Sequence, residues 1–521
     1  MARLYEYQGK EILKAHQIPV PEGRVVSSEA EARSAAVALA GPVVVKAQAW
    51  TTGRAGLGAI KFAQTPDEAA AAAASILGMK IGNFTVEKVL VERRIEIARE
   101  FYAGVIVDDA SRGLLALFSS MGGTGIEEIA RSHPEKLATI PFDVVEGLAE
   151  HAARNALRKI GLSGNTLVRA ASILASLARA ARAVEARTAE INPLVVTRGG
   201  AVIAADCRVT VDDYAVFRHA SLGIEIAREF DRPPTELERI AYRVEEGDYR
   251  GTFYFIQLEQ GFEAGSGYVG FHGAGGGGSM MSMDALLRQG FKIANFTDTS
   301  GNPPASKVYR AAKIIFSQRG IDGYFASGSG VASQEQYHSA RGLIKALWEL
   351  DPRIPAVVRL GGNQEERAIE ILAEGAKYLS APLEAYGKDD TAEKCAARLQ
   401  RLIAGDDTLP PRAGKPPTQG RAGPRQPYSF KTATGEITYD HAVCKTCESK
   451  ICIKECVPQI LKEENGVPVL AISEEEAARG KCTECLACEI ECVVRGAGGA
   501  FIHLPIVGLR DLIEKEKGAA A

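Results

Sequence analysis

The chain has 521 residues, which is too long for one domain and predicts three or four domains of about 150 residues each. Hydrophobic residues make up 46% and charged residues 24%, so the chain is globular rather than mostly disordered. The net charge of −3 leaves no basic surplus for binding a nucleic acid. The sequence holds no run of about 18 apolar residues and no apolar signal core near its start, so we expect a cytoplasmic protein without a membrane segment.

Short apolar runs alternate with helical patterns in the first part of the chain, which predicts an α/β domain over residues 1–224. Residues 144–187 are rich in Ala and Leu and have helical spacing. Two later β-runs flank the Gly-Gly turn at 199–200 and predict a hairpin. The predicted strands are 42–47, 86–91, 101–107, 114–118, 191–196 and 202–205.

A second α/β domain is expected over residues 225–404, where strands repeatedly end in glycine before a helix. This pattern predicts a doubly wound parallel sheet, in which ligands lie outside the carboxyl ends of the strands. The predicted strands 268–271, 323–326 and 356–360 lead into Gly-rich loops at 273–278, 327–330 and 361–363, and a helix is expected over 334–348.

A Pro-rich segment, residues 405–428, is expected to form a semi-extended linker because it combines six prolines with several Gly and Arg residues. Beyond it, residues 429–521 are expected to form a small α+β domain with a core of its own. This domain holds eight of the ten cysteines, all between Cys444 and Cys492. Crowded thiols in a chain without an export signal indicate metal binding rather than disulfides.

The eight cysteines form two sets of four, spaced Cys-x2-Cys-x4-Cys-x3-Cys and Cys-x2-Cys-x2-Cys-x3-Cys. The second spacing is that of bacterial ferredoxins, in which three close cysteines bind one [4Fe–4S] cluster and the fourth binds the other. We therefore predict two ferredoxin-like clusters with crossed ligation. The ligands are Cys444, Cys447, Cys452 and Cys492 for one cluster, and Cys482, Cys485, Cys488 and Cys456 for the other. The alternatives are a single or three-iron cluster and structural zinc, which the Cys-x2-Cys-x2-Cys triplet fits poorly.

Six motifs in the first 402 residues occur in an order that is specific to one enzyme family. They are LYEYQGK at 4–10, VVKAQ at 44–48, TGRAG at 52–56, AEINPL at 189–194, ANFTD at 294–298, and PAVVRL followed by GN at 355–363. With these motifs the chain resembles the β subunit of succinyl-CoA synthetase and related NDP-forming acyl-CoA ligases. The resemblance implies an ATP-grasp fold for the first domain and a flavodoxin-like ligase domain for the second.

The resemblance also implies that the first domain binds ATP or ADP. Lysine at a strand end and the amides of a Gly-rich loop are suited to phosphate oxygens. A carboxylate near a strand end can accept hydrogen bonds from ribose. The nucleotide-binding residues implied in this way are Lys46, Gly53, Arg54, Ala55, Glu92 and Glu100.

A magnesium site and a catalytic carboxylate follow from the same resemblance. Asn192 and Asp206 match the family's Mg²⁺ ligands, and both offer hard oxygen donors from the two arms of one hairpin. Glu190 lies two residues before Asn192, on the same face of a strand. In the family this glutamate contacts the phosphohistidine of the partner subunit, so Glu190 is the implied catalytic residue.

In the second domain the resemblance implies a substrate-facing loop after a strand, followed by a helix N-terminus that favours anions. The implied substrate-binding residues are His272, Gly330, Val331 and Ala332. His272 stands where the family has asparagine, and Ser327-Gly328-Ser329-Gly330 stands where it has Ile-Phe-Gly-Gly. These departures argue against carrying succinate over as the substrate, while the nucleotide and metal residues match.

The chain carries no convincing Gly-His-Ala-Gly motif, so the phosphohistidine and most of the CoA site are expected on a separate α-type subunit. The resulting hypothesis is the β subunit of an ATP-dependent, NDP-forming acyl-CoA ligase with a fused iron–sulfur module. That module would dock to, or exchange electrons with, a low-potential oxidoreductase or a ferredoxin. The alternative hypothesis is an iron–sulfur electron-transfer subunit in which the ligase fold is a scaffold or a nucleotide switch.

Overall fold

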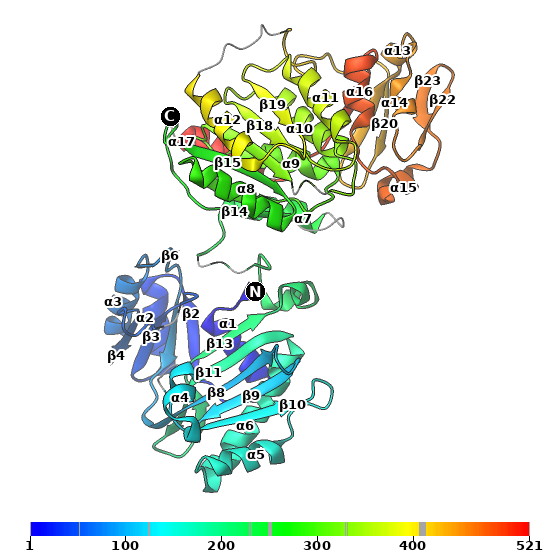
Figure 1. The fold of residues 1–521 in the computed structure, drawn as a ribbon. Coiled ribbons are helices and arrows are strands. Elements are labelled where there is room, and N and C mark those ends of the chain that lie inside the picture. The colour runs from blue at the N-terminus through cyan, green and yellow to red at the C-terminus, as the bar shows by residue number, and fades with distance from the viewer. Residues whose placement is uncertain are drawn as a thin grey trace. The chain divides into compact units, whose positions relative to one another are not determined.

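A computed structural model gives the structure of the chain. It describes residues 2–51, 53–122, 126–228, 230, 232–247, 253–328, 330, 332–405 and 413–519. The chain forms two compact units, Met1–Pro234 and Thr235–Ala521, which are considered separately below (Figure 1). The first unit therefore ends past the boundary expected at residue 224. No helix among the described residues has both the length and the apolar character that a membrane crossing requires.

The first unit is built around a large antiparallel sheet. Its strands follow the order β1 (Ala2–Arg3), β13 (Cys207–Val211), β11 (Ala186–Thr197), β8 (Ile97–Asp108), β9 (Gly113–Ser119) and β10 (Leu137–Phe142), and β12 (Val202–Ala204) pairs with β11. Helices α5 (Glu150–Lys159) and α6 (Gly164–Ala183) pack against this sheet. The shorter helix α4 (Ile126–Ser132) lies between β9 and β10 in sequence.

A smaller antiparallel sheet completes the first unit. Its strands follow the order β2 (Gly23–Val26), β7 (Val89–Arg93), β3 (Val43–Ala47) and β4 (Ile60–Ala63), next to the two-stranded hairpin β5 (Lys80–Ile81) and β6 (Phe84–Thr85). Helices α2 (Glu29–Leu39) and α3 (Pro66–Ile76) share one core of Ala, Val and Ile side chains with it. Helix α1 (Glu6–Ala15) packs against β13 of the large sheet.

The helical stretch expected over 144–187 is broken into α5 and α6 in the structure. Gly161, between the two helices, and Gly164, the first residue of α6, have φ values of +91° and +60°, a backbone that glycine adopts at low cost. The last residues of the stretch belong to β11. The hairpin expected at 191–205 is formed by β11 and β12, with Leu194 opposite Ala204.

The second unit contains a doubly wound sheet, in which every strand but the edge strand β14 is parallel. The order is β14 (Tyr254–Gln257), β16 (Lys292–Asp298), β15 (Tyr268–Ala274), β17 (Gly323–Gly328), β18 (Ala356–Arg359) and β19 (Leu383–Tyr386). Helices α8 (Gly276–Arg288) and α12 (Ala392–Ala404) cover one face. Helices α7 (Glu236–Glu246), α9 (Ala305–Phe316), α10 (Tyr337–Leu350) and α11 (Glu365–Ala376) belong to the core of the other face.

Two expectations for this sheet differ from the structure. The Gly-rich loop expected at 273–278 is much shorter, because β15 runs to Ala274 and α8 begins at Gly276. The helix expected from residue 334 begins at Tyr337, since the preceding residues form a loop fastened by a backbone hydrogen bond from Gln336 to Asn363 O at 2.8 Å.

The cysteine-rich segment folds into a small α+β structure within the second unit (Figure 1). One sheet has the order β20 (Pro427–Lys431), β21 (Glu436–Asp440) and β24 (Ala500–His503), and β22 (Leu461–Glu464) pairs with β23 (Val467–Leu470). Its helices are α13 (His441–Cys444), α14 (Ile451–Lys454), α15 (Glu474–Glu476) and α16 (Ala487–Arg495). Helix α17 (Leu509–Ala519) returns to α7 of the doubly wound domain.

The expected separation between this segment and the doubly wound domain is not found. One apolar core includes Leu343 and Trp348 of α10 together with Ile490 of α16. The described part of the Pro-rich segment is fastened by its side chains: Gln419 Nε2 donates to Trp348 O at 3.1 Å, and Arg421 donates to Ala500 O at 2.7 Å. The described part of the segment, which turns at residues 417–420, therefore lies on the domain instead of holding two separate cores apart.

Candidate functional site

Six charged side chains of the first unit meet in one buried group, which we call the buried charge cluster. Its members come from α1, β3, β7, the Gly-rich loop after β3 and the turn between β12 and β13. All are at most 8% exposed except Asp206, whose side chain is 24% exposed. The members are Glu6, Lys10, Lys46, Arg54, Glu92 and Asp206.

Lys46 lies near the end of β3, whose five residues are all buried. Its Nζ atom is 2.8 Å from Glu6 Oε1 and 2.9 Å from Glu92 Oε2, and it donates to Ala205 O at 2.7 Å. Burial lowers the pKa of Lys46, but the neighbouring carboxylates outweigh it and raise the pKa above its usual value. Lys46 is therefore a fully charged cation at a strand end.

Arg54 connects the Gly-rich loop to the same cluster. Its NH2 group is 2.7 Å from Asp206 Oδ2 and 2.8 Å from Glu6 Oε2, and its NH1 group donates to Ala47 O at 2.8 Å. The neighbouring Gly53, with φ of +69°, and Ala55 are exposed. The loop thus carries one buried cation between exposed backbone amides, a geometry suited to phosphate oxygens.

Two members of the cluster, Glu6 and Lys10, received no role from the sequence. Lys10 Nζ is 2.7 Å from Glu6 Oε1 and 2.5 Å from Glu92 Oε1. Both lie on the buried face of α1 together with Ile12 and Leu13. The available signal was their i, i+4 spacing on a face with apolar neighbours, inside the first of the six motifs.

The electrostatics of the cluster follow from its composition of three cations and three carboxylates. Burial raises the pKa of Glu6, but Lys46, Lys10 and Arg54 outweigh it and hold the pKa well below its usual value. For Asp206 burial is the largest effect and Glu6 adds to it, so its pKa is raised despite the nearby cations. A further cation beside Asp206 would therefore favour its charged form.

Glu190 and Asn192 lie on β11, next to the cluster. The backbone N–H of Asn192 donates to Asp206 O at 3.2 Å, which places the two predicted Mg²⁺ ligands on neighbouring segments. Glu190 lies opposite Arg208 on β13. Burial raises the pKa of Glu190 against the influence of Arg208, and Asp206 adds to the rise. Glu100 is half-buried on β8 opposite Val195 and is not a member of the cluster.

Of the predicted substrate residues of the second unit, His272 lies within β15, and Gly330 and Ala332 follow the carboxyl end of β17. Gly330 has a φ of +80°, and a Cβ atom there would lie 3.4 Å from the guanidinium of Arg359. Ala332 bridges to Gly362 in the loop after β18. Val331 lies outside the described residues.

His272 is enclosed within β15 and is 4% exposed. Its Nδ1 atom is 2.5 Å from Tyr324 Oη, and its Nε2 atom is 3.4 Å from Thr299 Oγ1. Burial lowers the pKa of His272 to about 3, so the imidazole is neutral at physiological pH. Its contact with substrate stays a prediction.

The eight cysteines of the C-terminal segment are free thiols, and seven of them are buried. Burial raises the pKa of Cys444 to about 12, with Cys492 and Cys447 adding to the rise. Burial raises the pKa of Cys452 to about 12 as well, and Cys492, Cys444 and Cys447 add to it. Cys492 of the second set therefore lies among the first three cysteines.

A matching group surrounds the second set. Burial raises the pKa of Cys482 to about 12, and Cys485 and Cys456 add to the rise. A hydrogen bond from the backbone N–H of Glu484 lowers this pKa but does not offset the burial. For Cys488 burial is again the largest cause, followed by Cys485, Cys482, Cys456 and Cys452, so its pKa lies well above the usual value. Cys456 of the first set is thus a neighbour of the second. Among the described residues, no three His, Cys, Asp or Glu side chains form a ready-made site for a metal ion.

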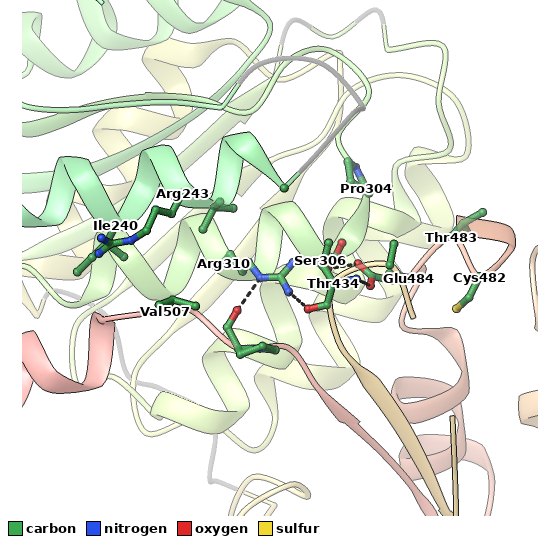
Figure 2. Close-up of a pocket in the computed structure, with 14 residues that line it drawn as sticks. Ile240, Arg243, Pro304, Ser306, Arg310, Thr434, Cys482, Thr483, Glu484 and Val507 are labelled. Atoms are coloured by element: carbon green, nitrogen blue, oxygen red, sulfur yellow. Dashed lines mark hydrogen bonds between the residues drawn. The ribbon is translucent and has the colours of Figure 1, made fainter. Parts of the chain in front are cut away.

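A cavity of about 190 Å³ lies where the cysteine-rich segment meets α7 and α9 (Figure 2). Arg310 of α9 donates to Pro505 O at 3.1 Å and to Thr434 O at 2.8 Å. Glu484 accepts hydrogen bonds from the backbone N–H and the hydroxyl of Thr434, at 2.8 and 2.7 Å. Cys482 also lines the cavity, so it reaches one of the predicted cluster ligands.

Comparison with known proteins shows which fold family the structure resembles. A family model described as an ATP-grasp domain matches residues 3–196. The ATP citrate lyase of Methanothrix soehngenii, solved with citrate and coenzyme A, aligns with 78% of this chain and 99% of its own at a TM-score of 0.63 and 19% identity. These matches confirm the predicted ATP-grasp and α/β fold class.

Several proteins are more similar to this chain in sequence than that structure is. The succinate–CoA ligase [GDP-forming] subunit beta of Thermus thermophilus is 38% identical over 369 residues, which cover 71% of this chain and 93% of that protein. The succinate–CoA ligase [ADP-forming] subunit beta 2 of Archaeoglobus fulgidus is 38% identical over 376 residues, or 72% and 93% of the two chains. With this identity over nearly the whole length of its relatives, the chain belongs to the family of succinate–CoA ligase β subunits, which are NDP-forming acid–thiol ligases.

Proposed function

We propose that the chain is the β subunit of an ATP-dependent acyl-CoA ligase whose nucleotide site is the buried charge cluster, with two [4Fe–4S] clusters in its C-terminal segment. The observation that carries the nucleotide site is that Lys46 and Arg54 meet at Glu6, with Asp206 paired to Arg54, at an otherwise exposed Gly-rich loop. A nucleotide's phosphates would compete with the carboxylates for these two cations.

The chain's own residues would position the phosphates. Glu6 and Glu92 hold the ammonium group of Lys46 at the end of β3, where an arriving phosphate would compete with them for it. Arg54 can exchange its carboxylate partners for phosphate oxygens, because the guanidinium fork suits both. Phosphoryl transfer depends mainly on such positioning and on electrostatic stabilisation.

Asn192 and Asp206 fit a magnesium ion, since an amide oxygen and a carboxylate oxygen are the hard donors that Mg²⁺ prefers. Burial, with Glu6 adding to it, raises the pKa of Asp206, and a bound cation would favour its charged form. When bound, the ion would neutralise charge on the phosphates. Glu190 lies beside this pair on β11 and would face the phosphoryl acceptor.

A partner subunit is part of the proposal. The relatives carry the names of β subunits, and this chain has no Gly-His-Ala-Gly motif for a phosphohistidine. An α-type subunit would supply that histidine and most of the CoA site. The names of the relatives include succinate, but the departures at His272 and at residues 327–330 leave the carboxylate substrate to be determined.

The fit of the C-terminal segment to two [4Fe–4S] clusters rests on how the thiols group. Cys492 contributes to the raised pKa of Cys452, and Cys456 to that of Cys482, which supports the crossed ligation that two-cluster ferredoxins use. A Cβ atom at Gly499 would lie 3.2 Å from Cys444 Sγ, so glycine leaves space beside that thiol. Backbone N–H groups of Lys450 and Ala497 point at Cys447, as donors to a cluster ligand do. When bound, such clusters carry single electrons.

One observation supports the alternative function, in which the chain is an electron-transfer subunit and the ligase fold is a scaffold. The cysteine-rich segment shares a core with the doubly wound domain, which is what a dedicated scaffold requires. ATP-dependent thioester formation by the complex of this chain with its α-type partner separates the two functions. Turnover supports the ligase, and its absence in a folded complex supplied with ATP, carboxylate and CoA supports the scaffold.

Binding of Mg-ADP to the full chain tests the nucleotide site directly. Lys46→Met removes a charge-assisted hydrogen bond worth about 1.5–3 kcal/mol, so the affinity measured by titration calorimetry should fall by about tenfold to a hundredfold. Lys61→Met is the matched control, because Lys61 on the neighbouring strand β4 bonds Ser75 at the surface. Equal affinity of both variants would refute the assignment.

A further inference from the structure

Two helices from different parts of the second unit are joined by buried ion pairs. Helix α10 belongs to the doubly wound domain, and α16 carries one predicted ligand of each iron–sulfur cluster. Arg341 NH2 is 2.9 Å from Glu491 Oε1, and Lys345 Nζ is 2.6 Å from Glu489 Oε2. The four side chains are only 2–5% exposed.

The ion pairs extend to further elements. Glu491 also lies 3.1 Å from Arg367 NH2 of α11. Glu489 lies 3.3 Å from Arg421 NH1 of the Pro-rich segment. The guanidinium of Arg341 stacks on the ring of Tyr337, the first residue of α10, at 4.7 Å. Acids on a single helix, α16, therefore bind cations from α10, α11 and the segment before β20.

These contacts make the positions of the two helices depend on each other. A buried charge that loses its partner is strongly unfavourable, because water no longer solvates it. Without α16 each cation would lose its shorter ion pair, while Lys345 would keep Glu349 of its own helix at 2.9 Å and Arg341 would keep Glu455 at 3.5 Å. The position of α16 in turn depends on its cysteines, since clusters of this kind organise the loops that bind them.

We propose that Arg341 and Lys345 are positioning residues through which the iron–sulfur clusters hold α10 and the loop before it, residues 332–336. The proposal rests on the proposed clusters and deepens their role. The clusters order the ligase domain at its predicted substrate loop, in addition to any transfer of electrons. The loop ends at Gln336, directly before α10, so a displaced α10 displaces the loop.

Hydrogen exchange on the full chain tests the dependence on clusters. Anaerobically purified protein is compared with protein from which oxygen and EDTA have removed the iron, with iron content measured in both. Amides in residues 332–350 should exchange at least tenfold faster after iron loss, while those of α6 in the first unit should be unchanged. Unchanged exchange in α10 after complete iron loss would overturn the proposal.

Charge variants test the ion pairs themselves. Arg341→Met and Lys345→Met should each speed exchange in α10 at least tenfold and alter the electron paramagnetic resonance spectrum of the dithionite-reduced clusters. Arg398→Met is the control, because Arg398 pairs with Glu384 in the same unit but away from α16, and it should change neither readout. If both α10 variants left the exchange of α10 and the spectrum unchanged, as Arg398→Met should, the proposal would be overturned.

A conservative variant guards against variants that fail to fold. Arg341→Lys keeps the charge beside Glu491 and should retain both the slow exchange of α10 and the wild-type spectrum. Loss of both readouts in this variant would show that the guanidinium shape, and not the charge pairing, positions the helix. Anaerobically purified protein without iron would refute the proposed clusters. The exchange rates of Arg341→Met would then still show whether the ion pairs hold α10 in place.

Discussion

The Glu6 carboxylate pairs with all three cations of the buried charge cluster, so its removal should destabilise the first unit. Its Oε1 atom is 2.7 Å from Lys10 Nζ and 2.8 Å from Lys46 Nζ, and its Oε2 atom is 2.8 Å from Arg54 NH2. Glu6→Gln keeps the size of the side chain and leaves three buried cations facing two carboxylates. Removing one partner of a buried ion pair destabilises a protein by about 3–5 kcal/mol.

The expected shift in melting temperature follows from the size of the unit. In a unit of this length each kcal/mol lowers the Tm by about 2–4 °C, so Glu6→Gln should lower the first unit's transition by about 6–20 °C. Scanning calorimetry of the full chain measures it. Glu22→Gln is the matched control, because Glu22 pairs with Arg93 at 3.1 Å on the surface and such a pair contributes at most about 1 kcal/mol. A transition of Glu6→Gln within the range of this control would refute the reasoning.

The pH dependence of the same variant has a defined sign. Burial raises the pKa of Glu6, but its three cations hold the pKa well below 4.5, the value of the unfolded chain. A lowered pKa in the folded state contributes stability that is present above the pKa of the unfolded chain and is lost as the pH falls through the folded value. The difference in Tm between wild type and Glu6→Gln should therefore be full at pH 7 and should narrow below about pH 4.5.

Three further outcomes are expected. Asp206→Asn should lower Mg²⁺-dependent turnover by about tenfold or more, or at least about 1.4 kcal/mol, and unchanged turnover would contradict its role at the metal. The anaerobic chain should contain about eight iron and eight sulfide per molecule, and Cys456→Ser should perturb the cluster bound by Cys482, Cys485 and Cys488; zinc without iron would contradict both statements. The isolated chain should form no acyl-CoA from ATP, carboxylate and CoA until an α-type subunit is added, and turnover by the chain alone would contradict the need for a partner.

Much of the fold could be predicted because it depends on local patterns. The apolar run at 43–45 predicts β3, and the Gly-Gly turn at 199–200 predicts the hairpin of β11 and β12. Helix limits were less predictable. Tyr337 begins α10 later than its pattern suggests, because Gln336 bonds Asn363 on another loop, and this long-range contact leaves no trace in the local sequence.

The candidate nucleotide site could be predicted in part. The family motifs pointed to Lys46, Arg54 and Asp206, which the structure brings together. Glu6 and Lys10 carried no prediction, because an i, i+4 pair of opposite charges on a helix is also the usual pattern of a solvated face. Their burial depends on β7 and β13, which lie more than 80 and 190 residues away in the sequence and supply Glu92 and the neighbours of Asp206.

The second unit shows why composition did not reveal the role of the Pro-rich segment. Prolines predict an extended backbone, and they do not predict where that backbone lies. Arg421 reaches Glu489, and Lys345 reaches the same carboxylate from α10, so a segment that resembles a spacer is fastened between two domains. If the proposed clusters are bound, oxygen damage to them would not stay confined to the cysteine-rich segment. It would displace Glu489 and Glu491, the acids of α16 that pair with Lys345 and Arg341 of the ligase domain.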